Sequence, residues 1–195
     1  MINYTETRPS DLLRFIALHC QLDEEARTAM NSVIREKVYK KGDKIIREGT
    51  VCNKIFFLET GLVKTLFRTD SREYIMRFFS ESNVFSVLDS FLEQKPSQYE
   101  IVALEDSTVS YILYDDLQTL CSKYHHVETF YRKLLSMAVI EMMNRVGRSL
   151  EETGIIAYNR FIQNQGHLLQ RISLADLASY LGITQVSLSR IRSIK

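Results

Sequence analysis

The spacing of apolar residues divides the chain into a helical start, a strand-rich middle and a helical second half. Residues 10–36 have helical spacing, with Ser10 placed to cap the first segment and acids in the first turn of "DEEARTAMNSVI". From Glu36 to Tyr114, short apolar runs are separated by polar or glycine breaks. We expect strands near 44–47, 54–58, 62–68, 74–79, 100–104 and 108–114, which together form an antiparallel barrel or roll.

Residues 117–150 return to helical spacing and have two apolar stripes. One stripe steps by three or four residues through Leu135, Val139, Met142, Val146 and Leu150. The other contains Phe130, Leu134, Met137 and Ile140. A helix with two apolar stripes has two surfaces to pack against. We expect its own β-roll on one side and the same helix of a second copy on the other, with Leu135, Val139, Met142 and Val146 in the seam. The alternative is a helix buried within one chain.

The C-terminal segment predicts a helix near 154–163 followed by two short helices. Ser173 and Asp176 form a capping box ahead of an apolar face that consists of Leu174, Leu177, Ala178 and Leu181. Gly182 is placed to end the first helix, and Thr184 is a good N-cap for the second. In the second helix, Leu188, Ile191 and Ile194 point inward.

Two short helices joined by a glycine turn are typical of a helix-turn-helix, whose second helix enters the major groove of DNA. Arginine can pair with guanine and glutamine with adenine, while hydroxyls and helix amides reach phosphates. We expect Arg171, Arg192 and Lys195 to contact phosphate. The alternative is an αα-corner of an unrelated helical protein. The predicted DNA-binding residues are Thr184, Gln185, Val186, Ser187, Ser189, Arg190 and Arg192.

Charge supports this interpretation weakly. The 195-residue chain is 45% hydrophobic and carries a net charge of +1. From Ile155 onward it has five basic residues and one acid, a surplus of four, so the part before Ile155 carries −3. A basic C-terminal unit on an acidic body favours binding to a polyanion. The absence of a long apolar run and of a basic, apolar N-terminal signal predicts a cytoplasmic protein with no membrane partner.

Two separate motifs resemble the CRP/FNR family of transcription regulators. "ISLADLASYLGITQVSLSRIR" is similar to the family's helix-turn-helix, and "KKGDKIIREGTVCNKIFFLETGLVKTLF" is similar to the first half of its cyclic-nucleotide-binding β-roll. The order of roll, long helix and helix-turn-helix also matches, so the resemblance covers nearly the whole chain. It implies a homodimer that binds a pseudo-palindromic site on double-stranded DNA and has RNA polymerase as a further partner.

The resemblance fails at the phosphate cassette. Cyclic-nucleotide binders of this family have a Gly-Glu pair that opens a short helix, and an Arg-Ser or Arg-Thr pair about ten residues later. An ungapped match anchored on "EIVALEDSTVSYI" puts Ser86-Val87 and Ser97-Gln98 at these positions. The carboxylate for the ribose and the arginine for the phosphate are therefore both missing. Lys95 is close in sequence, but its ammonium is a mobile point charge that cannot form the two parallel hydrogen bonds of an arginine guanidinium. We expect a degenerate effector pocket that does not bind cyclic AMP or cyclic GMP.

Other sensor chemistries of the family are poorly supported. An iron–sulfur cluster needs four closely spaced cysteines, whereas Cys20, Cys52 and Cys121 are three and scattered. A haem ligand among the histidines is the alternative to the surface or capping roles that we expect for them. Cys121 is interpreted as a small buried hydrophobe rather than a redox switch. The four histidines are His19, His125, His126 and His167. No metal or cofactor is expected.

These patterns together predict an α+β protein with an antiparallel, jelly-roll-like sensor domain. The expected parts are a β-roll with N-terminal helices (1–122), a dimerisation helix (123–152) and an all-α helix-turn-helix domain (153–195). The predicted function is sequence-specific DNA binding by a homodimeric CRP/FNR-type regulator. The alternative is an effector-sensing regulator that acts through protein contacts and has a vestigial DNA-binding unit. A metal-dependent barrel enzyme is disfavoured because residues 36–114 contain no histidine.

Overall fold

The computed structural model describes residues 11–70 and 72–193, and its architecture confirms the predicted α+β class. None of the helices in these ranges is long and apolar enough to cross a membrane. The elements are, in chain order, α1 (Asp11–His19), α2 (Glu24–Val33), β1 (Arg35–Tyr39), β2 (Lys44–Ile46), β3 (Lys54–Thr60), β4 (Val63–Thr69), β5 (Arg72–Phe79), β6 (Val84–Phe85), α3 (Leu88–Glu93), β7 (Glu100–Ala103), β8 (Ser107–Leu113), α4 (Tyr114–Lys123), α5 (His125–Glu151), α6 (Gly154–Gln165), the 3-10 turn Gly166–Leu168, α7 (Leu174–Tyr180) and α8 (Gln185–Ser193).

The strands form two four-stranded antiparallel sheets that face each other. Their strand orders are β1-β8-β3-β6 and β2-β7-β4-β5. Apolar side chains from both inner faces fill the space between them, which removes this surface from water. This inner core includes Phe56, Leu58, Val63, Phe79, Ile101 and Val109. All six expected strands are present within a few residues of their predicted bounds.

Three short elements were not expected from the sequence. The strand β1 exposes four of its five residues, so it has no alternation of apolar and polar positions that would reveal it. The strand β6 has two residues and the helix α3 has six, too few for a periodic signal. These elements owe their conformation to the neighbours they pair with or pack against.

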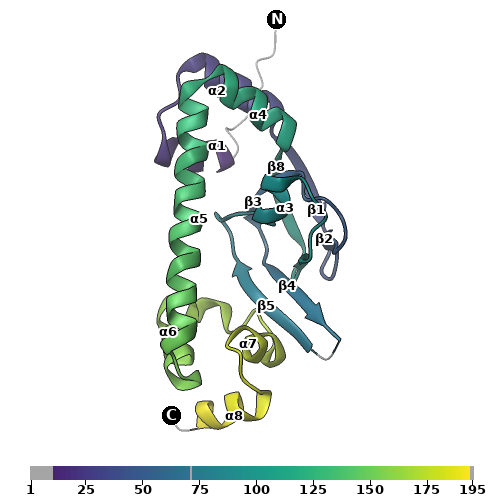
Figure 1. Ribbon diagram of the computed structural model, residues 1–195, viewed down its shortest axis with the longest axis vertical. Helices are drawn as coiled ribbons and strands as arrows, with labels where there is room; N and C mark the ends of the chain where they lie inside the picture. The colour runs from purple at the N-terminus through teal and green to yellow at the C-terminus, as the bar shows by residue number, and fades with distance from the viewer. Residues whose placement is uncertain (1–10, 71, 194–195) are drawn as a thin grey trace, which may run out of the picture.

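Helices α1, α2 and α4 cover one end of the roll, at the top of Figure 1. Asp23 caps α2, its carboxylate accepting a 2.8 Å hydrogen bond from the amide of Ala26. The predicted cap Ser10 lies outside the described residues. A second apolar cluster joins these helices to the first turns of α5 and to the sheet, and includes Ile16, Met30, Phe57, Leu120 and Phe130.

The 27-residue helix α5 runs along the side of the roll, and only the first half of its second apolar stripe packs as expected. Phe130 is buried and Leu134 packs against the same cluster, whereas Met137 and Ile140 are 44% and 61% exposed and do not pack against the roll. The side of α5 facing β5 is polar there, and Arg145 donates to the carbonyl of Ile75 at 3.4 Å. Residues 141, 145 and 148 share this face because they are four and three positions apart. The apolar side chains of α5 from Val139 onward therefore point away from their own chain.

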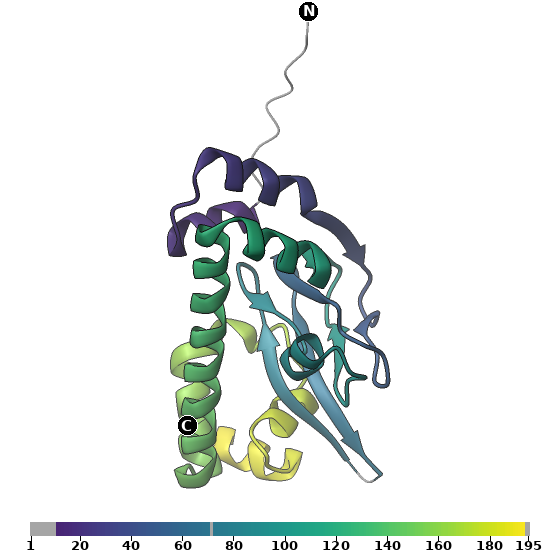
Figure 2. The same cartoon turned by 45° about the horizontal axis from the view of Figure 1, so that its top comes forward.

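The C-terminal helices pack on the outer face of the second sheet, as both views show at the lower end of the molecule (Figures 1 and 2). The strands β4 and β5 bury apolar side chains on both faces, because one face lines the roll and the other receives these helices. The shared cluster includes Leu66, Ile75 and Phe78 from the strands, and Phe161, Leu177 and Leu188 from the helices.

Candidate functional site

Local capping builds the terminal helix pair as the sequence predicts. The hydroxyl of Ser173 accepts a 3.0 Å hydrogen bond from the amide of Asp176 at the start of α7. Gly182 has a φ of +70°, the left-handed conformation that ends a helix at low cost for glycine. The hydroxyl of Thr184 then accepts from the amide of Ser187 at 3.1 Å and caps α8. Both helix starts and the turn between them are thus fixed by their own residues.

The helix α8 has one buried side and one exposed side. Leu188 is completely buried and Ile191 packs against the same cluster, as predicted, whereas Ile194 lies outside the described residues. The predicted DNA-contacting side chains between Thr184 and Arg192 all lie in solvent, and even the apolar Val186 is 62% exposed. The exposed set is Thr184, Gln185, Val186, Ser187, Ser189, Arg190 and Arg192. The structure therefore brings the predicted residues together on one accessible surface, which we call the recognition face.

The positive charge of the C-terminal unit is concentrated on this face. Within residues 11–70 and 72–193, neither Arg190 nor Arg192 forms an ion pair. Arg160, by contrast, is paired with Glu152. Lys195 lies outside the described residues. Unpaired guanidiniums on an exposed helix remain available to bases or phosphates.

Arg171 was assigned incorrectly as a phosphate contact. Its guanidinium forms two-pronged hydrogen bonds of 2.6–3.0 Å with the carboxylates of Glu105 and Glu81. It also donates to the carbonyl of Gly61 at 2.9 Å. Hydrogen bonds to Glu105 and Glu81 raise the pKa of Arg171 above its ordinary value. All its partners belong to the roll, so Arg171 fastens the C-terminal helices to the roll instead of facing DNA.

Further polar contacts attach α7 to the strands β4 and β5. Lys64 of β4 reaches Asp176 at 2.7 Å. The hydroxyl of Ser179 donates to the carbonyl of Glu73 at 2.7 Å and accepts from the amide of Ile75 at 3.1 Å. It thereby satisfies backbone groups on the edge strand of the sheet, where no further strand pairs. The helix-turn-helix is held in a defined orientation on the roll.

Sequence reasoning missed Arg72 as a candidate member of this surface. Arg72 lies at the start of β5 and is exposed, and its guanidinium donates to the carbonyl of Ile183 at 3.3 Å. Ile183 immediately precedes the N-cap Thr184, so Arg72 adds a cation beside the exposed amides of α8. The two residues are 111 positions apart, and no local pattern reveals their proximity.

The four cassette positions carry uncharged side chains. Val87 and Ser97 are each 3% exposed, and Gln98 is exposed at the surface. The hydroxyl of Ser86 donates to the carbonyl of Lys54 at 2.9 Å. The hydroxyl of Ser97 donates to the carbonyl of Tyr99 and accepts from its amide. Both serines are thus engaged with nearby backbone, and none of the four positions presents a cation or carboxylate to a ligand.

Lys95, the basic residue nearest to the cassette in sequence, is paired at the surface. Its ammonium forms a 2.7 Å ion pair with Glu93, and both side chains are highly exposed. The neighbouring acid Glu100 is 4% exposed and lies between Lys44 and Arg68. Its negative charge is compensated by these two cations. The cassette has no counterpart of an arginine that binds a cyclic phosphate.

The cysteines and histidines have ordinary structural environments. Burial raises the pKa of the Cys121 thiol to about 11, which disfavours the reactive thiolate. The ring of His19 lies 2.8 Å from the carbonyl of Phe15, and the ring of His126 lies 3.3 Å from Asp23. His125 and His167 are exposed. In the described ranges, His, Cys, Asp and Glu side chains form no group of three that holds a metal ion.

The outward side of α5 is a large exposed apolar surface. Val139, Met142 and Val146 of the predicted seam are 54%, 57% and 51% exposed, whereas Leu135 is half-buried. Ile140, Met143 and Leu150 extend this surface, with exposures of 61%, 65% and 81%. An apolar face of this kind on a soluble domain marks an interaction site. We call these residues the α5 apolar face.

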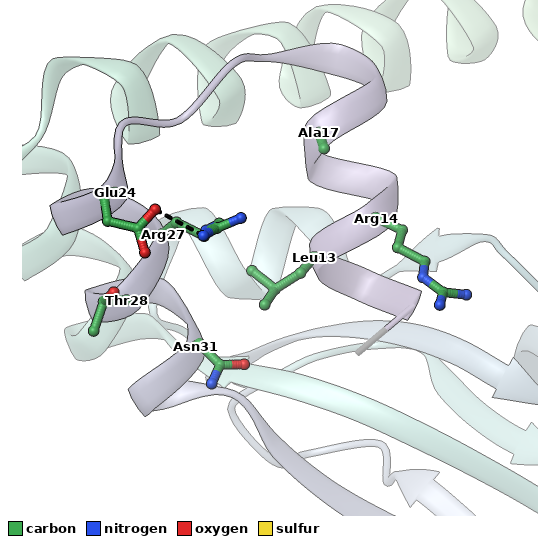
Figure 3. Close-up of a pocket in the computed structure, with 7 residues that line it drawn as sticks. All are labelled: Leu13, Arg14, Ala17, Glu24, Arg27, Thr28 and Asn31. Atoms are coloured by element: carbon green, nitrogen blue, oxygen red, sulfur yellow. Dashed lines mark hydrogen bonds and ion pairs between the residues drawn. The ribbon is translucent and has the colours of Figure 1, made fainter. Parts of the chain in front are cut away.

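A shallow hollow lies between α1 and α2 (Figure 3). It is lined by Leu13 and Ala17 of α1 and by Glu24, Arg27 and Thr28 of α2, among others. Glu24 and Arg27, which line the hollow, form an ion pair of 2.7 Å with each other. This hollow is at the opposite end of the molecule from α8 (Figure 1), so it is separate from the recognition face.

Comparisons with known proteins agree with this architecture. Residues 36–124 match the family model of the cyclic nucleotide-binding domain. FixK2 from Bradyrhizobium japonicum has a similar structure, with a TM-score of 0.71 and 22% identity over 83% of this chain and 84% of that chain. The c-di-GMP responsive regulator CLP from Xanthomonas campestris gives 0.70 and 14% over 88% and 91%. The Thermus thermophilus catabolite activator protein gives 0.57 and 19% over 92% and 85%. No curated protein sequence matches the chain.

Proposed function

We propose that this protein is a homodimeric, sequence-specific DNA-binding transcription regulator. Its residues 36–124 match the cyclic nucleotide-binding domain, and its fold is that of CRP/FNR regulators. It acts in the cytoplasm, has no catalytic activity and has RNA polymerase as a further partner. The observation that carries this proposal is the recognition face of α8. A buried Leu188 anchors the helix, while Gln185 and Arg190 extend into solvent.

The alternative function, a protein-contact regulator with a vestigial helix pair, does not explain that face. The Ser173 cap, the turn at Gly182 and the Thr184 cap fix the helix pair. The helix α7 is also attached to the roll by its own polar contacts. A surface without a ligand has no requirement for two exposed arginines at defined positions of a capped helix. DNA supplies both the bases and the phosphates that such side chains bind.

We expect no binding of cyclic AMP or cyclic GMP at useful affinity. Calorimetric titration of the purified chain with either nucleotide is expected to give no saturable heat, because the cassette offers neither a carboxylate nor an arginine. The Xanthomonas neighbour, described as c-di-GMP responsive, indicates that this fold is compatible with other effectors. Saturable binding of cyclic AMP or cyclic GMP with a micromolar dissociation constant would contradict the proposal of a cyclic-AMP- and cyclic-GMP-independent regulator.

Replacing Arg190 by alanine is expected to change sequence preference. Arg190 lies opposite the buried Leu188 side, and one bidentate contact to guanine contributes ~1 to 3 kcal/mol per half-site. Binding-site selection on wild type should enrich a pseudo-palindrome whose half-sites are about one DNA turn apart. The same selection on Arg190→Ala should show relaxed preference at one base position of each half-site.

The matched variants are Arg192→Ala and Arg72→Ala. Both arginines are exposed, and we assign both to phosphate contacts. Each variant should weaken binding to all sequences alike. It should also reduce the slope of the logarithm of the binding constant against the logarithm of the salt concentration by about one. If Arg190→Ala enriches the same site with unchanged discrimination, α8 does not read bases and the proposed function fails.

A further inference from the structure

The edge strand β5 carries backbone groups that no further strand satisfies. In an antiparallel strand the N–H and C=O of one residue point to the same side, so alternate residues of an edge strand turn both groups outward. Ile75 is one of these residues. Its amide donates to the hydroxyl of Ser179 in α7 at 3.1 Å, and its carbonyl accepts from the guanidinium of Arg145 in α5 at 3.4 Å. One residue of the sheet edge is therefore bonded to both helices, at the lower end of the roll in Figure 1.

A ring contact joins α5 to α7 at the same place. The guanidinium of Arg145 lies over the ring of Tyr180, 4.8 Å from its centroid, and Tyr180 follows Ser179 directly in α7. Cation–π contacts are stronger where the groups are partly removed from water, as both side chains are. The ring of Tyr180 also lies 5.2 Å from that of Phe78 and 5.6 Å from that of Phe161. We call the contacting residues the β5 junction, which consists of Ile75, Arg145, Ser179 and Tyr180.

The β5 junction connects the two surfaces whose relative placement a dimeric DNA-binding protein has to fix. Another side of α5 carries the α5 apolar face, which we assign to the dimer seam. The turn at Gly182 and the buried Leu188 attach α8 to α7. A tilt of α7 against α5 therefore moves the recognition face relative to the dimer axis.

We propose that Arg145 and Ser179 are positioning residues that set the spacing between the two DNA half-sites. This inference rests on the proposed function and adds a determinant of specificity that lies outside the recognition face. A change of one base pair between the half-sites moves one of them by about 3.4 Å and turns it by roughly 34° around the DNA axis. A dimer whose recognition helices are held by the β5 junction fits one spacing, whereas a loosened α7 adapts to several.

The test is binding of the full chain to duplexes that carry the selected half-sites with the spacer unchanged, one base pair shorter or one base pair longer. Wild type should bind the altered spacers about tenfold more weakly than the preferred one, because one recognition helix then loses its base contacts. In Arg145→Met and in Ser179→Ala this spacing ratio should fall to about threefold or less, with the base preference inside each half-site unchanged. A purely structural defect would lower the active fraction equally for all duplexes and leave the ratio as it is.

Two matched variants complete the binding test. Ser179→Thr keeps the hydroxyl and should retain the wild-type ratio, as should Arg47→Met, which changes an exposed arginine elsewhere on the roll. If Arg145→Met fails to fold, Ser179→Ala carries the test. A ratio that stays at the wild-type value in the folded junction variants would overturn this inference and leave the proposed function intact. A wild type without sequence-selective DNA binding would remove the proposed function, and this inference with it.

Hydrogen exchange without DNA tests the β5 junction separately. The amide of Ile75 bonds to Ser179 and not to Arg145, so Arg145→Met should accelerate its exchange only if Arg145 holds α7 against the strand. We expect exchange of this amide to be about fivefold faster or more in Arg145→Met, and unchanged in Arg47→Met. An equal exchange rate in Arg145→Met and wild type would overturn the assignment of Arg145 as a positioning residue.

Discussion

Replacing Val139 and Met142 together by glutamate is expected to convert the protein to a monomer. Both side chains belong to the α5 apolar face and are more than half exposed in the single chain. In a dimer this face is desolvated, and two unpaired carboxylates on each copy would cost several kcal/mol. Analytical ultracentrifugation should show a dimer for wild type and a monomer for the double variant.

The monomer should also bind DNA weakly, because a pseudo-palindromic site requires two recognition helices. Asn31→Glu is the matched control. Asn31 is exposed on α2 and lies outside the α5 apolar face. Its substitution should leave the dimer intact. A wild-type monomer, or a double variant that sediments as the wild type does, would show that the α5 apolar face is not the seam.

The sequence was most informative where a structure is determined by nearby residues. The caps Ser173 and Thr184, the turn at Gly182 and the buried Leu188 all follow from short-range spacing, and the structure has each of them. The same holds for the six expected strands, whose inner faces require alternating apolar residues. Local chemistry thus made both the roll and the recognition face predictable.

Long-range ion pairs were not predictable in the same way. Arg171 meets partners 66 and 90 residues away, and its neighbours in sequence contain no sign of them. A lone arginine in a basic segment looks the same whether it binds phosphate or carboxylate. On α5, the apolar residues Met137 and Ile140 suggested contact with the roll, but the charged residues at 141, 145 and 148 occupy that side. Pattern predicts which residues share a helix face, whereas the partner of that face is decided by the tertiary fold.

Replacing Arg171 by methionine is expected to destabilise the folded chain. The substitution retains an unbranched side chain but leaves Glu81 and Glu105 without their cation. Since the side chain of Arg171 is 26% exposed, the effect should lie between those of surface and buried pairs, about 2 to 4 kcal/mol. Urea unfolding of Arg171→Met and of Arg192→Met should show this loss in the first variant and little change in the second.

Acid should remove the same stabilisation from the wild type. The hydrogen bonds from Arg171 lower the pKa of Glu81 from 4.5 to about 2 in the folded chain. Protonation therefore favours the unfolded chain, so this contribution is fully present above about pH 4.5 and is lost as the pH falls toward 2. Arg171→Met lacks this interaction already, and its stability should fall less steeply across that window. If Arg171→Met instead keeps wild-type stability and pH dependence but binds all DNA sequences more weakly, Arg171 is a phosphate contact after all. Its pairing with Glu81 and Glu105 would then not be what holds the helix-turn-helix on the roll.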